Sequence, residues 1–278
     1  MDVNISKALY EAKKILKDKG MRPALESETL LSHLLGVDRV YLHMHAQEEL
    51  DAFAFEHFMH MVKVRSKGKP LEYITHEVSF YGRLFFVDER VLIPRPETEI
   101  LVHQASQIIQ DYGIKNVVEV GIGSGVVSVS LAIAHPKISI LATDISMEAL
   151  EVASVNIATF NLQNRISLFQ TSLMEGVDIQ ARTLVVSNPP YVALDYPLDP
   201  SVRYEPEIAL YGGEQGDEII KALIDEAAHK RVRYLACEMG ATHRASLSEY
   251  LGLQKYQASF YSDYAGLDRG FVAIRQTN

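Results

Sequence analysis

The chain has little cysteine, no tryptophan and no long apolar run. Its single cysteine, Cys237, excludes a disulfide within these 278 residues and a cysteine metal cluster, and no metal site is expected. The longest apolar stretch, Val126 to Ala134, is broken by two serines and is far shorter than the ~20 residues of a membrane span. The N-terminus has no apolar core after a basic start, as a secretion signal would have. These absences predict a cytoplasmic protein that does not bind a membrane.

Positive charge is also scarce, because 27 Lys and Arg stand against 36 Asp and Glu and leave a net charge of −9. Residues 1–75 hold 11 basic and 11 acidic side chains, so the whole excess lies after them. A catalytic part with this charge is unsuited to grip a phosphate backbone unaided, but it tolerates a cationic ligand. One basic cluster, at the end of the third helical run, either faces water or contacts an RNA-bearing partner: Lys63, Arg65, Lys67 and Lys69.

The hydrophobic pattern changes twice along the chain, and this predicts two domains and a joint. Helical spacing of apolar residues predicts a small bundle of helices over 1–72. Alternation over 73–93 is typical of one or two β-hairpins, which would link the domains. From 94 to 278 strands alternate with helices, and the chain ends with two strands around a turn. This order predicts an α/β fold: a mainly parallel sheet, covered on both faces, with an antiparallel C-terminal hairpin.

A glycine turn closes the first strand of this sheet, in the segment Glu119-Val120-Gly121-Ile122-Gly123-Ser124-Gly125. The third glycine comes one residue earlier than in the dinucleotide pattern G-x-G-x-x-G, and an acidic residue precedes the turn. Such a turn suits a nucleoside ligand that carries an ammonium group and no phosphate, such as S-adenosylmethionine. Gly121 to Gly125 would pass close to its amino-acid part, and Glu119 would neutralise positive charge there, directly or through water.

Asp144 ends the next strand, 19 residues after Gly125. A carboxylate at this place can accept hydrogen bonds from both ribose hydroxyls of a nucleoside. The alternative is that Asp144 only caps the helix that follows, but Ser146 serves that role as well. We therefore expect Asp144 to contact the cofactor.

The turn Asn188-Pro189-Pro190-Tyr191 follows a later strand of the same sheet. Its two prolines remove two N–H donors, so the Asn188 side-chain oxygen and the Pro189 carbonyl remain as acceptors, and Tyr191 adds a flat apolar face. Acceptors that bind both hydrogens of a planar –NH2 group stabilise the positive charge that grows on nitrogen during methyl transfer. The alternative, an ordinary strand-ending turn, is weakened by the cofactor motif at the same sheet edge. We expect Asn188, Pro189 and Tyr191 to be catalytic.

Over nearly its whole length, the chain resembles the HemK-like glutamine methyltransferases that modify peptide-chain release factors. The segment Ile-Pro-Arg-Pro-Glu-Thr-Glu at residues 93–99 is the most specific part of the resemblance. The Asn-Pro-Pro-Tyr turn is shared with enzymes that methylate the amino group of adenine. Further segments similar to the family are Leu25–Leu31, Val185–Tyr191, Tyr204-Glu205-Pro206, Ala209-Leu210, Gly212-Gly213 and Asp263–Arg269.

The resemblance implies a class I, Rossmann-like methyltransferase sheet with an N-terminal helical domain that helps to grip the release factor. It implies methyl transfer from S-adenosylmethionine to the side-chain amide nitrogen of the glutamine in a Gly-Gly-Gln loop. Asn188, Pro189, Pro190 and Tyr191 would bind that glutamine, and Leu173 would lie near the adenine. The expected cofactor contacts are Glu119, Gly121, Ile122, Gly123, Ser124, Gly125, Asp144, Leu173 and Asn188.

Four positions depart from the usual family pattern: Glu119, Ile122, Ser172 and Glu207. They bear on cofactor affinity and on the loop after the Asn-Pro-Pro-Tyr turn, but not on the chemistry. Two rival functions remain: an adenine amino-methyltransferase on DNA or RNA, which the acidic balance disfavours, and a binding module without catalysis, which the intact turn disfavours. We expect a monomer that acts on release factors and has no stable nucleic-acid binding.

Overall fold

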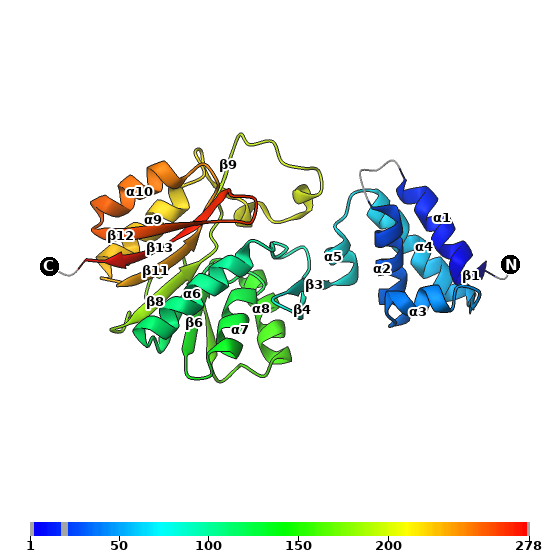
Figure 1. Cartoon of the computed structure of the whole chain (residues 1–278), viewed down its shortest axis with the longest axis horizontal. Helices are drawn as coiled ribbons and strands as arrows, with labels where there is room; N and C mark the ends of the chain where they lie inside the picture. The colour runs from blue at the N-terminus through cyan, green and yellow to red at the C-terminus, as the bar shows by residue number, and fades with distance from the viewer. Residues whose placement is uncertain (1–2, 18–21, 277–278) are drawn as a thin grey trace. The chain divides into compact units, whose positions relative to one another are not determined.

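The computed structural model describes residues 3–17 and 22–276, and the chain is traced by colour in Figure 1. The chain divides into two compact units. The helical unit comprises the described residues up to Glu77 together with the loop segment Asp199–Tyr204. The sheet unit comprises Val78–Leu198 and the described residues from Glu205 onward. The division lies five residues after the predicted end of the helical domain at residue 72.

The helical unit is a small bundle with its own core. Asn4, Asp38 and Asp51 each accept a backbone N–H at the start of a helix, which satisfies donors that the first turn leaves unpaired. A short antiparallel strand pair, β1 (Val3–Asn4) and β2 (Glu49–Leu50), accompanies the helices. The helices are α1 (Ile5–Leu16), α2 (Pro23–Leu35), α3 (Arg39–Met44), α4 (Ala52–Ser66) and α5 (Leu71–Thr75).

Two ion pairs tie the helices of this unit together. Arg65 Nε lies 2.7 Å from Glu26 Oε2, and both side chains are largely buried. Arg39 Nη2 lies 2.7 Å from the buried Glu28, and this pairing lowers the pKa of Glu28 against the opposing effect of burial. Arg65 belongs to the basic cluster noted in the sequence, so one member of that cluster faces the interior of the helical unit rather than a partner.

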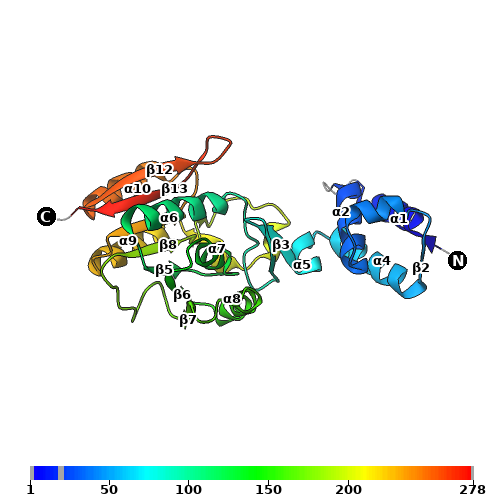
Figure 2. The same cartoon turned by 60° about the horizontal axis from the view of Figure 1, so that its bottom comes forward.

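The sheet unit is built on seven strands in the order β12-β13-β11-β8-β5-β6-β7. β11, β8, β5, β6 and β7 run parallel, whereas β13 is antiparallel to β11 and to β12. Figure 2 shows the β12–β13 hairpin reaching its turn at one end of the sheet. The strands are β5 (Asn116–Val120), β6 (Ser139–Asp144), β7 (Ile166–Gln170), β8 (Thr183–Ser187), β11 (Tyr234–Glu238), β12 (Tyr256–Ser262) and β13 (Asp268–Arg275).

Alternating residues of the central strands enter two cores, one on each face of the sheet. Val117 packs into the first core and Val118 into the second, because successive side chains of a strand point to opposite faces. The helices α6 (Thr98–Tyr112), α7 (Val126–Ala134) and α8 (Met147–Thr159) contribute to the first core. The helices α9 (Glu218–His229) and α10 (Arg244–Leu253) contribute to the second. Both faces are therefore covered, as the near-continuous apolar strands predict.

A hairpin of β3 (Glu77–Phe80) and β4 (Arg83–Phe86) precedes α6. Phe80 and Phe85 meet edge to face, with ring centroids 6.2 Å apart, and both belong to the first core of the sheet unit. After the sheet's β8, the loop contains the short parallel pair β9 (Val192–Ala193) and β10 (Tyr211–Gly213), and the 3₁₀ turns Val202–Tyr204 and Glu207–Ala209. In the ranges 3–17 and 22–276, no helix is long and apolar enough to cross a bilayer.

The predicted fold class is confirmed, including the antiparallel hairpin at the C-terminus and the N-terminal helices. The sequence did not predict α10, since only Leu247 and Leu251 of this helix are buried and give a weak periodic signal. It did not predict α3, which has six residues and buries only Leu42.

Candidate active site

The carboxyl ends of four parallel strands meet at one edge of the sheet and carry the candidate residues. In spatial order, β11 ends at Glu238, β8 at Ser187, β5 at Val120 and β6 at Asp144. Because the strands are in register, the segments that follow them lie side by side. The glycine turn, Asp144 and the Asn-Pro-Pro-Tyr turn are thereby brought to the same edge.

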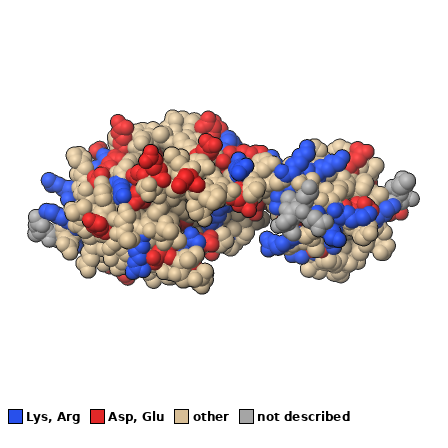
Figure 3. Space-filling model, turned by 90° about the horizontal axis from the view of Figure 1, so that it is seen from above, with Lys and Arg blue, Asp and Glu red and all other residues tan. Residues whose placement is uncertain are grey.

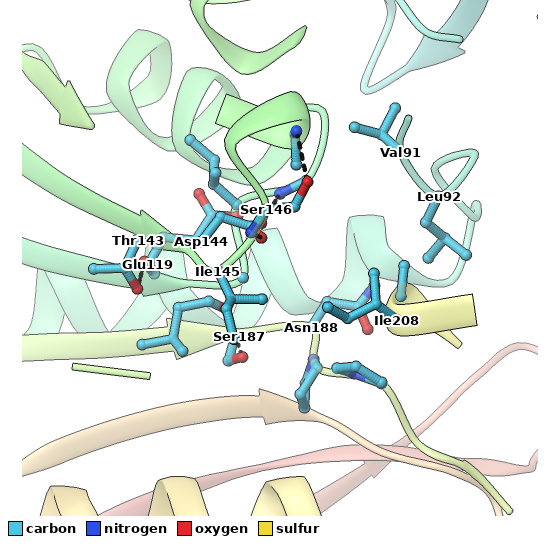
Figure 4. Close-up of a pocket in the computed structure, with 18 of the residues that line it drawn as sticks. Val91, Leu92, Glu119, Thr143, Asp144, Ile145, Ser146, Ser187, Asn188 and Ile208 are labelled. Carbon is cyan, nitrogen blue, oxygen red and sulfur yellow. Dashed lines mark hydrogen bonds between the residues drawn. The ribbon is translucent and has the colours of Figure 1, made fainter. Parts of the chain in front are cut away.

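A cavity of about 250 Å³ opens at this edge. Figure 4 shows Glu119, Asp144 and Asn188 around it. Of the residues predicted to bind ligands, those that line the cavity are Glu119, Gly121, Ile122, Gly123, Ser124, Asp144, Leu173, Asn188, Pro189 and Pro190. Gly125 and Tyr191 do not line it.

The backbone of the glycine turn faces the open cavity. Gly121 and Gly123 have φ angles of +73° and +54°, and a Cβ added to either would meet no atom within 4 Å. A ligand can therefore approach the main chain where a side chain would otherwise stand. Gly125 has another role, since an added Cβ there would lie 3.4 Å from the Cβ of Ala153 on α8. Its lack of a side chain lets α7 and α8 pack closely at the start of α7.

Two acidic side chains flank the glycine turn. Glu119 is buried and accepts a hydrogen bond from Ser128 Oγ, and burial raises its pKa to about 8. Asp144 accepts backbone hydrogen bonds from Gly123 to Oδ2 and from Ser146 to Oδ1, each 3.0 Å long. Burial also raises the pKa of Asp144, and these backbone donors oppose the rise. Each oxygen of Asp144 retains acceptor capacity toward the cavity.

Ser146 supplies the side-chain cap of α8, because its Oγ accepts the N–H of Ala149 at 3.1 Å. The interpretation that Ser146 rather than Asp144 caps this helix is confirmed. Beside it, Leu173 lines the cavity with a φ of +47°, and its carbonyl accepts a 2.7 Å hydrogen bond from Thr143 Oγ1. This contact holds the loop after β7 in a conformation that residues with a side chain adopt rarely.

Thr98 and Glu205 hold two further segments against the cavity. Asn188 Nδ2 donates to Thr98 Oγ1 at 3.2 Å, so the Asn188 Oδ1 remains as the acceptor for a ligand. Glu205 is buried, and its carboxylate accepts hydrogen bonds from Arg95 at 2.6 Å and from the N–H of Ile93 at 3.0 Å. This anchor precedes the residues of the long loop that line the cavity: Pro206, Ile208 and Ala209.

Tyr191 points away from the cavity and into the sheet unit. Its ring packs against the second core, and its hydroxyl donates to Glu238 Oε1 at 3.2 Å. Burial, together with the nearby charge of Glu238, raises the pKa of Tyr191 well above its usual value. The flat face predicted to stack on a substrate is therefore partly occupied by protein, and the hydroxyl has a partner that the sequence did not identify.

Sequence reasoning did not single out Thr98, Glu205 or Glu238 as functional. Glu238 had a local signal, since it is a carboxylate that ends an apolar strand, as Asp144 does, and Glu119 stands one residue before the end of β5. Thr98 and Glu205 lie in segments similar to the family, but the sequence did not indicate their partners, which are 90 residues away for Thr98 and 110 for Glu205.

The fold and the residues at this edge define a class I methyltransferase. A family model described as "Methyltransferase small domain" matches residues 97–196, and one described as "PrmC N-terminal domain" matches residues 7–75. The chain resembles the solved catalytic domain of hMettl16 in complex with the MAT2A 3'UTR hairpin 6, with a TM-score of 0.56 at 18% identity over 78% of this chain and 93% of that one. This likeness concerns the fold alone.

Curated relatives specify the family. The release factor glutamine methyltransferase of Clostridium acetobutylicum is 32% identical over 98% of this chain and 99% of its own length. Those of Chlorobaculum tepidum and Deinococcus radiodurans are each 34% identical over 91% of both chains. The chain belongs to the release factor glutamine methyltransferase family, and the resemblance seen in its sequence motifs is confirmed.

Proposed function

We propose that this protein transfers a methyl group from S-adenosylmethionine to the side-chain amide nitrogen of the glutamine in the Gly-Gly-Gln loop of peptide-chain release factors. One observation carries the proposal. A single cavity combines an open glycine backbone and a carboxylate, Asp144, with the donor-poor corner at Asn188 to Pro190. The substrate class follows from the family to which the chain belongs.

The residues of the cavity fit S-adenosylmethionine. The turn at Gly121 and Gly123 leaves space beside the main chain for the amino-acid part. Glu119 lines the same cavity, where a bound ammonium group would favour its ionised form against the effect of burial. Asp144 offers an acceptor to each ribose hydroxyl, and Leu173 offers an apolar contact to the adenine. When bound, the cofactor supplies an electrophilic methyl group.

The corner after β8 prepares the substrate nitrogen. An amide nitrogen is a weak nucleophile because its lone pair is delocalised. The Asn188 Oδ1 and the Pro189 carbonyl each accept one N–H, and these bonds strengthen as positive charge grows on nitrogen. The corner needs no strong base before attack, since the proton becomes acidic only after the methyl group has moved. Tyr191 supports the corner from the protein side.

The helical unit is proposed to recognise the release factor, with 1–72 as the recognition domain, 73–93 as the joint and 94–278 as the methyltransferase domain. Large apolar side chains on its surface support a protein partner: Tyr10, Val40, Met44 and Phe53, which are 59–77% exposed. On the face drawn in Figure 3, acidic and basic side chains are interspersed over the sheet unit. This mixed charge supports a protein that does not bind nucleic acid stably, and we propose that it is a cytoplasmic monomer.

The test is a methyl-transfer assay with radiolabelled S-adenosylmethionine and three acceptors: a release factor, the same factor with its loop glutamine changed to alanine, and nucleic acid. Label is expected only on the unaltered factor. Label on nucleic acid alone would establish the rival function, an adenine amino-methyltransferase. Equal label on both forms of the factor would place the modification at another residue.

A further inference from the structure

Glu238 is a buried carboxylate beside the turn Asn188-Pro189-Pro190-Tyr191. It ends β11 and is 1% exposed. The preceding Cys237 is paired in register with Ser187 of β8, so Glu238 lies next to Asn188 at the sheet edge. A buried carboxylate costs free energy unless polar groups around it compensate, so its surroundings indicate its role.

Glu238 lies beside two side chains connected with this turn. It binds Tyr191 directly, and Thr98 stands between it and Asn188. Tyr191 donates its hydroxyl to Oε1 at 3.2 Å. Thr98, which accepts the Asn188 amide at 3.2 Å, lies close enough to Glu238 to lower its pKa. Among the described residues, Oε2 has no partner at regular hydrogen-bond geometry, so the carboxylate retains an acceptor for the Thr98 proton.

The number of protons on these groups determines which of them donates and which accepts each hydrogen bond. A hydroxyl has one proton, so when Thr98 Oγ1 accepts from Asn188 Nδ2, its own proton is left for another acceptor. An ionised Glu238 accepts the Tyr191 hydroxyl at Oε1, and its unpartnered Oε2 is free to accept the Thr98 proton. With that arrangement, the Asn188 amide keeps its nitrogen toward Thr98 and its oxygen toward the cavity.

We propose that Glu238 is a positioning residue for methyl transfer: its carboxylate holds the Tyr191 hydroxyl and, through the Thr98 hydroxyl, the amide orientation of Asn188. The inference rests on the proposed function and extends it to a residue that does not touch the substrate. Buried polar networks of this kind hold one arrangement only when every proton has an acceptor.

The charge of Glu238 makes this arrangement sensitive to pH. Burial raises the pKa of Glu238 to about 7, while the hydrogen bond from Tyr191 and the nearby Thr98 hydroxyl oppose the rise. A protonated Glu238 carries a hydrogen on one of its oxygens, so that oxygen no longer accepts a proton. The hydroxyl of either Thr98 or Tyr191 must then change its orientation. The turnover rate should therefore rise as pH passes through about 7. The other titratable or charged groups that act with Glu238 are Glu97, Cys237, Tyr261 and Arg269.

The experiment measures methylation of a purified release factor by the wild type and by Glu238→Gln, at saturating cofactor and from about pH 6 to pH 8.5. Glutamine keeps the shape but replaces one acceptor with a donor. We expect kcat to fall roughly 10-fold to 100-fold, as a misplaced reacting geometry predicts, and its rise near neutral pH to disappear. The affinity for S-adenosylmethionine, measured by calorimetry, should stay unchanged. In a Thr98→Val, Tyr191→Phe background, Glu238→Gln should have little further effect.

Asp225→Asn is the matched control, because Asp225 also accepts a tyrosine hydroxyl, that of Tyr250 at 2.7 Å, but on the α9–α10 side of the unit. It should leave kcat unchanged. An active wild type with an equally active Glu238→Gln variant would overturn the inference and leave the proposed function standing. An inactive wild type would instead refute the proposed function. If Glu238→Gln does not fold, a wild-type kcat that is flat across the pH range overturns the inference.

Discussion

Replacing Asn188 with alanine should slow methyl transfer strongly without abolishing it. In the proposed mechanism, the Asn188 side chain is one of two acceptors for the substrate amide and the Pro189 carbonyl is the other; both residues line the cavity. Removal of one group that stabilises developing charge costs roughly 2.7–4 kcal/mol of transition-state stabilisation, which corresponds to a fall in kcat of roughly 10²–10³. The remaining Pro189 carbonyl belongs to the backbone and is unaffected, so residual activity should stay measurable.

The assay follows label transfer to a release factor at saturating concentrations of both substrates, so that kcat is measured apart from KM. Asn116→Ala is the matched control, because Asn116 begins β5 at the opposite edge of the same sheet and its amide donates to Gln180. Its kcat should equal that of the wild type. Thermal unfolding of both variants should show intact folding.

A wild-type rate in Asn188→Ala would refute the reasoning, because it would mean that the side-chain oxygen does not prepare the nitrogen. A kcat unchanged with a raised KM would also contradict it. That result would show that Asn188 binds the glutamine equally in the ground state and the transition state. Only a fall in kcat itself supports the proposed stabilisation.

Three further predictions concern the cofactor part of the cavity. Gly123→Ala and the control Gly113→Ala both place a Cβ on a backbone of positive φ with open space around it, so each variant should lose about 1 kcal/mol of stability. Only Gly123→Ala should weaken cofactor binding in calorimetry. Equal affinities in the two variants would contradict the prediction that the cofactor approaches the main chain at Gly123. Asp144→Ala should weaken binding at least about 10-fold, because hydrogen bonds to a charged group contribute roughly 1.5–3 kcal/mol, and an unchanged affinity would leave Asp144 a purely structural role. Burial raises the pKa of Glu119 to about 8, so the native state holds this proton more tightly than the unfolded state does, and the Tm of the cofactor-free protein should fall from pH 5 to pH 8. Glu119→Gln should reduce that fall, and an identical pH dependence in the variant would contradict the assignment.

The sheet, the order of its strands and of all its long helices except α10, and the edge at which the site motifs meet were predictable from the sequence. Strands that are buried on both faces consist almost wholly of apolar residues, and the helices between them have their own spacing. The glycine turn, Asp144 and the Asn188 turn each follow such a strand directly. Because parallel strands end at one edge, local pattern was enough to place these three features together.

The partners of those features were decided only by the tertiary structure. Thr98 reaches Asn188 across 90 residues of chain, and Arg95 reaches Glu205 across 110. Neither pair leaves a periodic or spacing signal, since nothing in the local sequence specifies a hydrogen bond over such a separation. The orientation of Tyr191 was also decided by the tertiary structure. Its residue type suggested stacking on a substrate, but in the packed second core its hydroxyl binds Glu238.

The sequence by itself thus determined the class of fold, the family and the chemical character of the site, because these depend on residue types that follow one another along the chain. The tertiary structure alone decided which side chain the Asn188 amide nitrogen binds and which buried carboxylate lies beside Asn188 at the sheet edge. These depend on contacts between segments that meet only after the sheet has formed, when burial makes the direction of each hydrogen bond energetically significant.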